Sequence, residues 1–447
     1  MPQHSSLFPR DFRKSLPVAV RGEGSWLFTA DGRKFLDAAG QAAVVNIGHG
    51  VPEIARAMAE QSAQLAFAHT SQFHSPSAEH LAARLLALAP QSFRNGGRVY
   101  FTSGGSEATE TAIKLARQFQ LERGQPARFR ILSRRQSYHG ATLGAMTVSG
   151  NVARRAPYQP LLQEWGHIAP CFCYRCPFEK SFPQCQLACA DDLRTFLGSD
   201  SSTAAAFIFE PVVGATLGAA GPPDGYAARI AEICREHDIL LIADEVMTGL
   251  GRTGKPFAVQ HWGVEPDMIL AGKGIAGGYA PLGAVLVAPH VVEGFERGSG
   301  AFKHGFTYQA HPVSTAAGDA VLDYLEGHHL FSRVAPAAEK LRAALAPLLA
   351  HPQVGDIRGR GLLLGIEFVR DKSTRTPFDP REAIAEKIRA AAMDEGVVVY
   401  PTQGCVDGSR GDHVLLAPPF IITREESALI AKALSIALER VFPAASV

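Results

Sequence analysis

Between about residues 98 and 288, short apolar segments rich in β-branched and aromatic residues alternate with segments of helical periodicity. The expected strands are 98–102, 129–133, 206–209, 239–243, 268–270 and 282–288. The expected helices include 107–121, 226–237 and a short piece near 256–262. Strands and helices that alternate in this way are typical of a mainly parallel sheet covered on both faces. Ligands of such sheets bind beyond the carboxyl ends of the strands, where we therefore expect a functional site.

The two ends of the chain indicate a second, smaller domain. A hairpin is expected from strands at 25–29 and 34–37, because Asp31-Gly32 between them is a typical hairpin turn. The next expected elements are helices at 52–65 and 77–88, a long helix from about 311 to 326, and a strand at 361–368. Thr423 and Glu426 form a capping box for the last helix. The predicted divisions are an N-terminal segment of the small domain (1–60), the large domain (61–315) and the rest of the small domain (316–447).

Length and composition favour an ordinary globular protein with more than one domain. The chain has 447 residues, of which 46% are hydrophobic and 19% charged. Its net charge of +1 gives no electrostatic basis for binding nucleic acid or an anionic membrane. No stretch approaches the about 18 unbroken apolar residues of a membrane span, and Met1–Ser6 lacks the basic and apolar parts of a secretory signal. We expect a cytoplasmic enzyme without nucleic-acid or membrane partners.

Five of the seven cysteines lie close together, in the pattern C-x-C-x2-C-x8-C-x3-C. In a reducing compartment such a cluster either binds a metal or stays reduced. Cys173, Cys176, Cys185 and Cys189 could hold zinc or an iron–sulfur cluster, but no histidine or second C-x2-C completes a known pattern. The favoured prediction is therefore reduced thiols without metal, and a metal site is the alternative.

An acid and an amine follow two strands that are expected to be neighbours. Asp244 comes directly after 239–243, and Lys273 stands between two glycines just after 268–270. A carboxylate that holds a protonated pyridine and a lysine that forms a Schiff base are the groups that pyridoxal phosphate (PLP) chemistry requires. The alternatives are an aspartate that caps a strand end and a solvated surface lysine. The pair predicts a PLP enzyme.

A glycine-rich turn, Ser103-Gly104-Gly105-Ser106, joins the first of these strands to a helix. Glycines let the backbone approach an anion closely, and the free N–H groups at a helix start are donors to it. The alternative is a plain glycine turn in which Ser106 caps the helix. The turn lacks the G-x-G-x-x-G spacing, and Gly272-Lys273-Gly274 fails the P-loop pattern, so a dinucleotide fold and a P-loop are disfavoured.

Several segments, in one order, resemble the class III aminotransferases, which are PLP enzymes of fold type I. The segments are 103–108, 137–142, 209–212, 244–254, 272–279, 306–308 with 311–313, and 418–420. Together they cover nearly the whole chain, from about residue 30 to 440. The resemblance implies an α/β protein of PLP fold type I, with a mainly parallel sheet in the large domain and a smaller α+β domain built from both termini.

The resemblance also implies the residues that contact the cofactor ring. Lys273 would bind PLP as a Schiff base and carry the proton between substrate and cofactor carbons. Asp244 would keep the pyridine nitrogen protonated, so that the ring accepts electrons. Tyr138 would stack on one face of the ring and Val246 would cover the other, although as isolated residues both are typical of core packing.

The phosphate of PLP would be bound by Gly105 and Ser106, and by Thr307 of a second subunit. The resemblance therefore implies a homodimer with shared active sites. Glu210 would lie near the cofactor as a supporting acid, or else cap a strand end.

Substrate recognition is the least determined part of the sequence. Related enzymes bind the keto-acid carboxylate with a mobile arginine before the Pro-Pro segment, and Arg410 is the nearest candidate; an exposed loop arginine is the alternative. Residues 40–44 are small where some relatives have a tryptophan, which implies a roomier pocket.

The resulting hypothesis is a PLP-dependent transaminase that moves an amino group from an amine or ω-amino acid to a keto acid, by a ping-pong mechanism. Pyruvate is the expected acceptor, because Ser137-Tyr138-His139-Gly140 resembles the amine:pyruvate branch. A decarboxylase or aminomutase of the same fold is the alternative. A non-catalytic regulator would need a DNA-binding segment, and the sequence has none that is recognisable.

Overall fold

The structure is a computed structural model that describes residues 6–443. Its central sheet has the strand order β4-β10-β9-β8-β7-β5-β6. The strands are β4 (Arg98–Thr102), β5 (Arg130–Arg134), β6 (His167–Ile168), β7 (Ala204–Phe209), β8 (Leu240–Asp244), β9 (Met268–Ala271) and β10 (Gly283–Val287). From β9 to β6 all neighbours are parallel, whereas β10 is antiparallel to both β9 and β4. The prediction of a mainly parallel sheet is confirmed.

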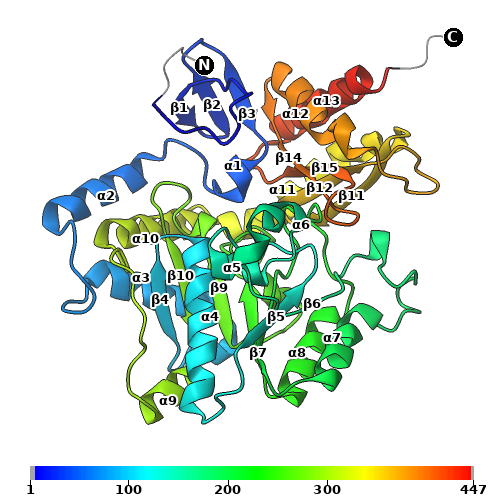
Figure 1. Cartoon of the computed structure of the whole chain (residues 1–447). Coiled ribbons are helices and arrows are strands. Elements are labelled where there is room, and N and C mark those ends of the chain that lie inside the picture. Colours follow the sequence, from blue (N-terminus) through cyan, green and yellow to red (C-terminus); the bar gives the residue numbers. More distant parts are fainter. Residues whose placement is uncertain (1–5, 444–447) are drawn as a thin grey trace.

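Helices cover both faces of this sheet, and alternate residues of each strand contact different helices. Phe207 and Phe209 of β7 share an apolar cluster with residues of α8 (Tyr226–Glu236). Ala206 and Ile208 share another with residues of α4 (Gly105–Glu122), which lies across the sheet in Figure 1. The whole of β7 is buried, as expected for a strand between two helical layers.

The N-terminal hairpin pairs with a strand from the other end of the chain. The sheet β1-β2-β3-β13 contains β1 (Ala19–Glu23), β2 (Trp26–Thr29), β3 (Lys34–Asp37) and β13 (Val397–Val398). The hairpin is confirmed, whereas β1 was not predicted. Because β13 runs parallel to β3, the two ends of the chain form one structure, as the resemblance implies.

A third sheet, β11-β12-β15-β14, belongs to the C-terminal part of the chain (Figure 1). Its strands are β11 (Val354–Arg360), β12 (Leu363–Phe368), β14 (Tyr400–Gln403) and β15 (Asp412–Leu416). The helices packed near it are α11 (Leu330–Leu345), α12 (Ile384–Asp394) and α13 (Arg424–Val441). The helix α10 (Pro312–Gly327) leads into this region and packs against α2 (Pro52–Gln64) and α3 (Pro76–Leu88).

The boundaries 1–60, 61–315 and 316–447 stay a prediction. The prediction that Met1–Ser6 is not a secretory signal concerns residues that lie mostly outside the described part of the chain, because Met1–Ser5 are not described. Among residues 6–443, no helix is both long enough and apolar enough to cross a membrane.

The predicted capping box at the start of α13 is confirmed, and it also ties both ends of the chain together. Glu426 N–H donates to Thr423 Oγ1 at 3.1 Å, and Thr423 N–H donates to Glu426 Oε2 at 2.9 Å. The other carboxylate oxygen, Oε1, accepts a hydrogen bond from Trp26 Nε1 at 2.8 Å. One side chain thus caps α13 and anchors β2 to it.

We expect Glu426→Ala to lower the free energy of unfolding by about 1–3 kcal/mol, because it removes a helix cap and leaves the Trp26 N–H without its acceptor. The measurement is denaturant unfolding followed by fluorescence. The control is Glu439→Ala, which removes an exposed carboxylate from the same helix. Equal stability of the two variants would contradict this role of Glu426.

Candidate active site

A cavity of about 170 Å³ lies where the strands of the central sheet end at their carboxyl side. Its lining comes from the segments after β4, β5, β7, β8 and β9: Gly105, Ser106, Tyr138, His139, Gly140, Glu210, Val212, Asp244, Val246, Met247 and Lys273. The structure therefore brings together six of the predicted site residues: Lys273, Asp244, Gly105, Ser106, Tyr138 and Val246. Thr307 and Arg410 do not line the cavity.

Lys273 lies directly beyond β9, and its backbone φ of 47° is in the left-handed region. This conformation is uncommon for residues other than glycine. Burial lowers the pKa of Lys273 to about 8, although the Asp244 and Glu210 carboxylates act in the opposite direction. An amine with this pKa is partly unprotonated near neutral pH and is therefore a usable nucleophile.

Both carboxylate oxygens of Asp244 are occupied by protein donors. Oδ2 lies 2.7 Å from His139 Nδ1, and Oδ1 accepts a hydrogen bond from Val246 N–H at 3.1 Å. His139 is buried, and within residues 6–443 its other ring nitrogen, Nε2, has no hydrogen-bond partner. His139 therefore orients Asp244. His139 belongs to the motif Ser137-Tyr138-His139-Gly140, and nothing in that motif indicates its contact with Asp244.

Glu210 holds the loop that carries Tyr138. Its Oε1 accepts a hydrogen bond from Tyr138 N–H at 3.0 Å, and its Oε2 accepts one from Gly214 N–H at 2.8 Å. Burial raises the pKa of this carboxyl group; the charge of His139 opposes the rise, and Asp244 adds to it. The structure thus places Glu210 as a buried support for the loop of Tyr138.

The start of α4 forms one wall of the cavity. The helix has Gly104 as its N-cap, and none of the described side chains caps it. Its first N–H groups are therefore open to an anion. Ser106 Oγ accepts a hydrogen bond from Ala141 N–H at 3.0 Å, so Ser106 is not the N-cap. A Cβ atom at Gly105 would lie 2.8 Å from Val246 Cγ1, so only glycine fits there.

The two remaining predicted site residues lie elsewhere on the chain. Thr307 is exposed in the irregular segment before α10. Arg410 is also half-exposed: its Nε donates to Asp407 Oδ2 at 2.6 Å, and its backbone N–H donates to Asp407 Oδ1 at 2.8 Å. Arg410 is therefore engaged within its own loop.

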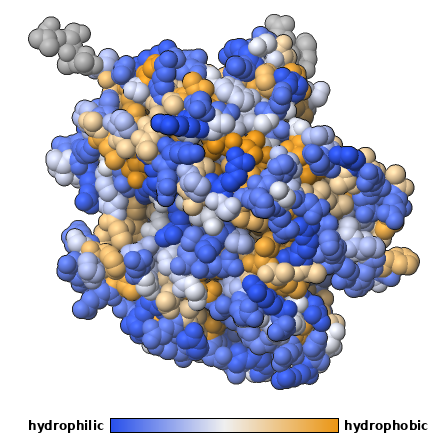
Figure 2. Space-filling model, turned by 180° about the vertical axis from the view of Figure 1, so that it is seen from behind, coloured by the Kyte–Doolittle hydropathy of each residue, from blue (hydrophilic) through white to orange (hydrophobic). Residues whose placement is uncertain are grey.

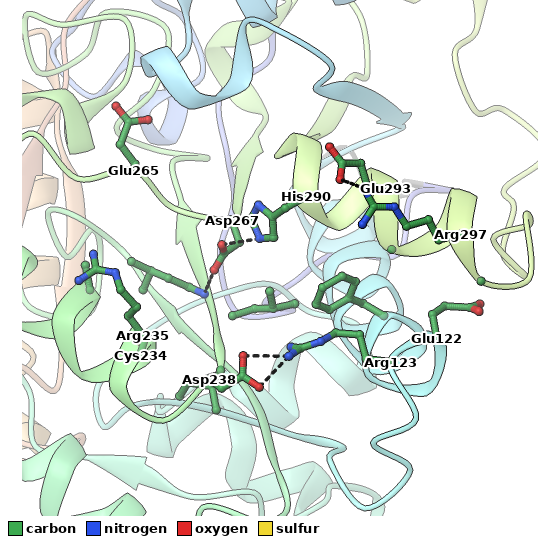
Figure 3. A pocket seen from close by; sticks show the side chains of 17 residues that line it. Glu122, Arg123, Cys234, Arg235, Asp238, Glu265, Asp267, His290, Glu293 and Arg297 are labelled. Atoms are coloured by element: carbon green, nitrogen blue, oxygen red, sulfur yellow. Dashed lines mark hydrogen bonds and ion pairs between the residues drawn. The ribbon is translucent and has the colours of Figure 1, made fainter.

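A larger cavity, of about 590 Å³, lies at the amino ends of β8 and β9 (Figure 3). Six of its lining side chains form three ion pairs. Arg123 contacts Asp238 at 2.8 Å, His290 contacts Asp267 at 2.9 Å, and Arg297 contacts Glu293 at 2.9 Å. Because these pairs neutralise each other at the end of the sheet opposite Lys273, this cavity is a poor candidate for the catalytic site.

The cysteines give the metal alternative no support. Among residues 6–443, no group of three or more His, Cys, Asp or Glu side chains is placed to hold a metal ion. All seven cysteines of this part of the chain are free thiols.

Comparison with known proteins agrees with the geometry. Residues 8–438 match the sequence model of a family described as "Aminotransferase class-III". The uncharacterized aminotransferase YodT of Bacillus subtilis is 41% identical over 94% of this chain and 95% of its own. A thermostable (S)-enantioselective omega-transaminase from Thermomicrobium roseum has a TM-score of 0.90 at 38% identity, covering 98% of this chain and 97% of the other.

An amine transaminase from an uncultivated Pseudomonas species, solved in its PLP-bound internal aldimine form, also has a TM-score of 0.90. It is 38% identical, with 98% of each chain covered. These solved structures are PLP fold type I transaminases, so the predicted fold is confirmed. The match over nearly the whole chain, together with the fold, shows that this protein is an enzyme that belongs to the class III aminotransferases.

Proposed function

We propose that this aminotransferase moves an amino group from an amine or ω-amino acid to a keto acid such as pyruvate, by a ping-pong mechanism with PLP. The observation that carries the proposal is one cavity that contains Lys273, Asp244 and the uncapped start of α4. The likeness to an amine transaminase and an omega-transaminase supports amines as donors. A cytoplasmic location stays a prediction of the sequence.

The residues that line the cavity fit PLP in kind and in charge. The first N–H groups of α4, with Gly105 and Ser106, would bind its phosphate. Tyr138 and Val246 would contact the ring, and Asp244 would hold the pyridine nitrogen. When bound, PLP supplies an electron sink for a carbanion at the substrate carbon.

Lys273 and Asp244 would have different roles in proton transfer. Lys273 Nζ would bind the cofactor and then carry the proton from the substrate carbon to the cofactor carbon. Asp244 would hold a proton on the pyridine nitrogen, and the contact with His139 Nδ1 orients Asp244. Glu210 fixes the backbone of Tyr138, so that its ring can orient the cofactor.

The proposed function is tested with purified protein incubated with PLP. We expect a yellow protein that loses this absorbance when an amine donor is added and recovers it with pyruvate. Lys273→Ala should lose the colour and about 1000-fold or more of the activity, because no other amine replaces the nucleophile. Lys255→Ala, an exposed lysine, is the control. Release of carbon dioxide or isomerisation of a single substrate would favour the decarboxylase or aminomutase alternative instead.

The lowered pKa of Lys273, about 8, predicts a pH dependence of cofactor binding. PLP should bind the apoprotein faster as the pH rises through this value, because only the unprotonated amine attacks. Glu210→Gln removes a negative charge that raises the Lys273 pKa, so the midpoint should move to lower pH. This midpoint is measured by following PLP binding with stopped-flow absorbance between about pH 6 and pH 10. Glu293→Gln is the control, and a midpoint that rises in Glu210→Gln would contradict this assignment.

We also propose a homodimer with shared active sites, in which Thr307 of one subunit reaches the phosphate site of the other. Two observations support this. Thr307 is exposed outside its own cavity, and its neighbour Tyr308 is 62% exposed. Phe8 (89%), Phe12 (67%) and Phe73 (63%) are also exposed, and Figure 2 shows apolar patches on one face of the molecule. Exposed apolar surface of this kind is typical of interfaces.

Mixed dimers test the sharing of sites. A dimer of one Lys273→Ala subunit and one Thr307→Asp subunit has one intact site if Thr307 acts across the interface, so about half of the wild-type activity is expected. Each variant alone should be inactive. If Thr307 acts within its own subunit, the mixed dimer has no intact site. An inactive mixed dimer, or a monomer by light scattering, would contradict the proposal.

A further inference from the structure

The proposed function requires a cation for the carboxylate of the keto acid, and the inference below rests on that function. Three of the cations around the site already have other roles. Lys273 is the proposed nucleophile, and Arg410 is paired with Asp407. Arg252 is buried and donates to the carbonyl oxygens of Leu362, Pro418 and Val45.

Arg154 lies next to the cavity and has no such role. It is half-buried on the short helix α6 (Val152–Arg155), and its Cζ atom lies 4.7 Å from the centroid of the Tyr138 ring. Tyr138 lines the cavity, and the positive charge of Arg154 also contributes to the lowered pKa of Lys273. Within residues 6–443, no carboxylate forms an ion pair with Arg154.

The neighbouring residue Arg155 makes very different contacts from those of Arg154. Arg155 is buried and donates to the carbonyl oxygens of Met146, Thr147 and Ser149, so it holds its own loop together. Among the described residues, Arg154 is held by its backbone, where its N–H donates to Asn151 Oδ1 at 3.0 Å, and by the Tyr138 ring. A guanidinium group fixed by an aromatic face keeps its N–H donors available for a planar anion.

We propose that Arg154 binds the carboxylate of the keto acid acceptor and of amino acid donors, beside the Tyr138 ring. Guanidinium groups bind carboxylates with two parallel hydrogen bonds, which gives both affinity and orientation. Arg154 would thus be a specificity-determining residue that separates carboxylate-bearing substrates from simple amines. In this role it replaces Arg410, which the sequence suggested.

A matched pair of donors tests the proposal. L-Alanine and isopropylamine differ in one group, a carboxylate in place of a methyl. In single half-reactions, Arg154→Gln should raise the KM for alanine by about 30- to 100-fold and change that for isopropylamine by less than about threefold. Arg154→Lys should restore part of the loss. Arg135→Gln, which removes an exposed arginine three residues before Tyr138, is the control.

Binding of propionate to the PLP-loaded protein, followed by calorimetry, gives a readout without turnover. Arg154→Gln should weaken this binding at least about tenfold. Equal losses for both donors, unchanged propionate affinity, or a selective loss in Arg410→Gln instead would overturn the proposal. A wild-type protein that binds propionate through Arg154 but converts neither donor would leave the inference standing and count against the proposed function.

Discussion

Charges buried at the carboxyl ends of the parallel strands are balanced locally, and the site depends on this balance. Asp244 and Glu210 are both buried, and a buried carboxylate without partners is strongly destabilising. Asp244 is satisfied by His139 and Val246, and Glu210 by two backbone N–H groups. The contacts of Asp244 with His139 and of Glu210 with Tyr138 each join loops from different strands. The compensation of charge therefore also fixes the relative positions of the residues around the cavity.

Much of the fold follows from local patterns in the sequence. A strand buried on both faces, such as β7, reads as an unbroken apolar run, and the Thr423–Glu426 cap is defined by two residues three apart. Two of the missed strands, β1 and β6, lack such patterns. β1 is mostly exposed, and β6 has only two residues. The antiparallel direction of β10 is set by pairing with β9 and β4, which periodicity does not encode.

The site could be predicted only where its residues lie in recognisable segments. Lys273, Asp244 and the turn before α4 each follow a strand, so their convergence follows from the topology of the sheet. The contact of His139 with Asp244 joins positions 105 residues apart, and no local sequence pattern indicates it. Arg410 is the opposite case. Its partner Asp407 is three residues away in a tight turn, and this local pairing competes with a role in binding substrate.

The segment from Gly40 to Ala43 adds a constraint on the shape of the pocket. All four residues have positive φ, and each non-glycine residue costs about 1–2 kcal/mol in this conformation. Such strain persists only where the surroundings impose it. Ala43 shares an apolar cluster with Val212 and Met247, which line the cavity.

A larger side chain at position 43 would compete with Val212 and Met247 for the space at the cavity wall. The small residues at 40–44 are therefore consistent with the prediction of a roomy pocket. An apolar wall of this kind offers no charge, so it suits the uncharged part of a substrate. Arg154 at the Tyr138 ring then supplies the polar contact that orients a carboxylate, and the two features divide substrate recognition between them.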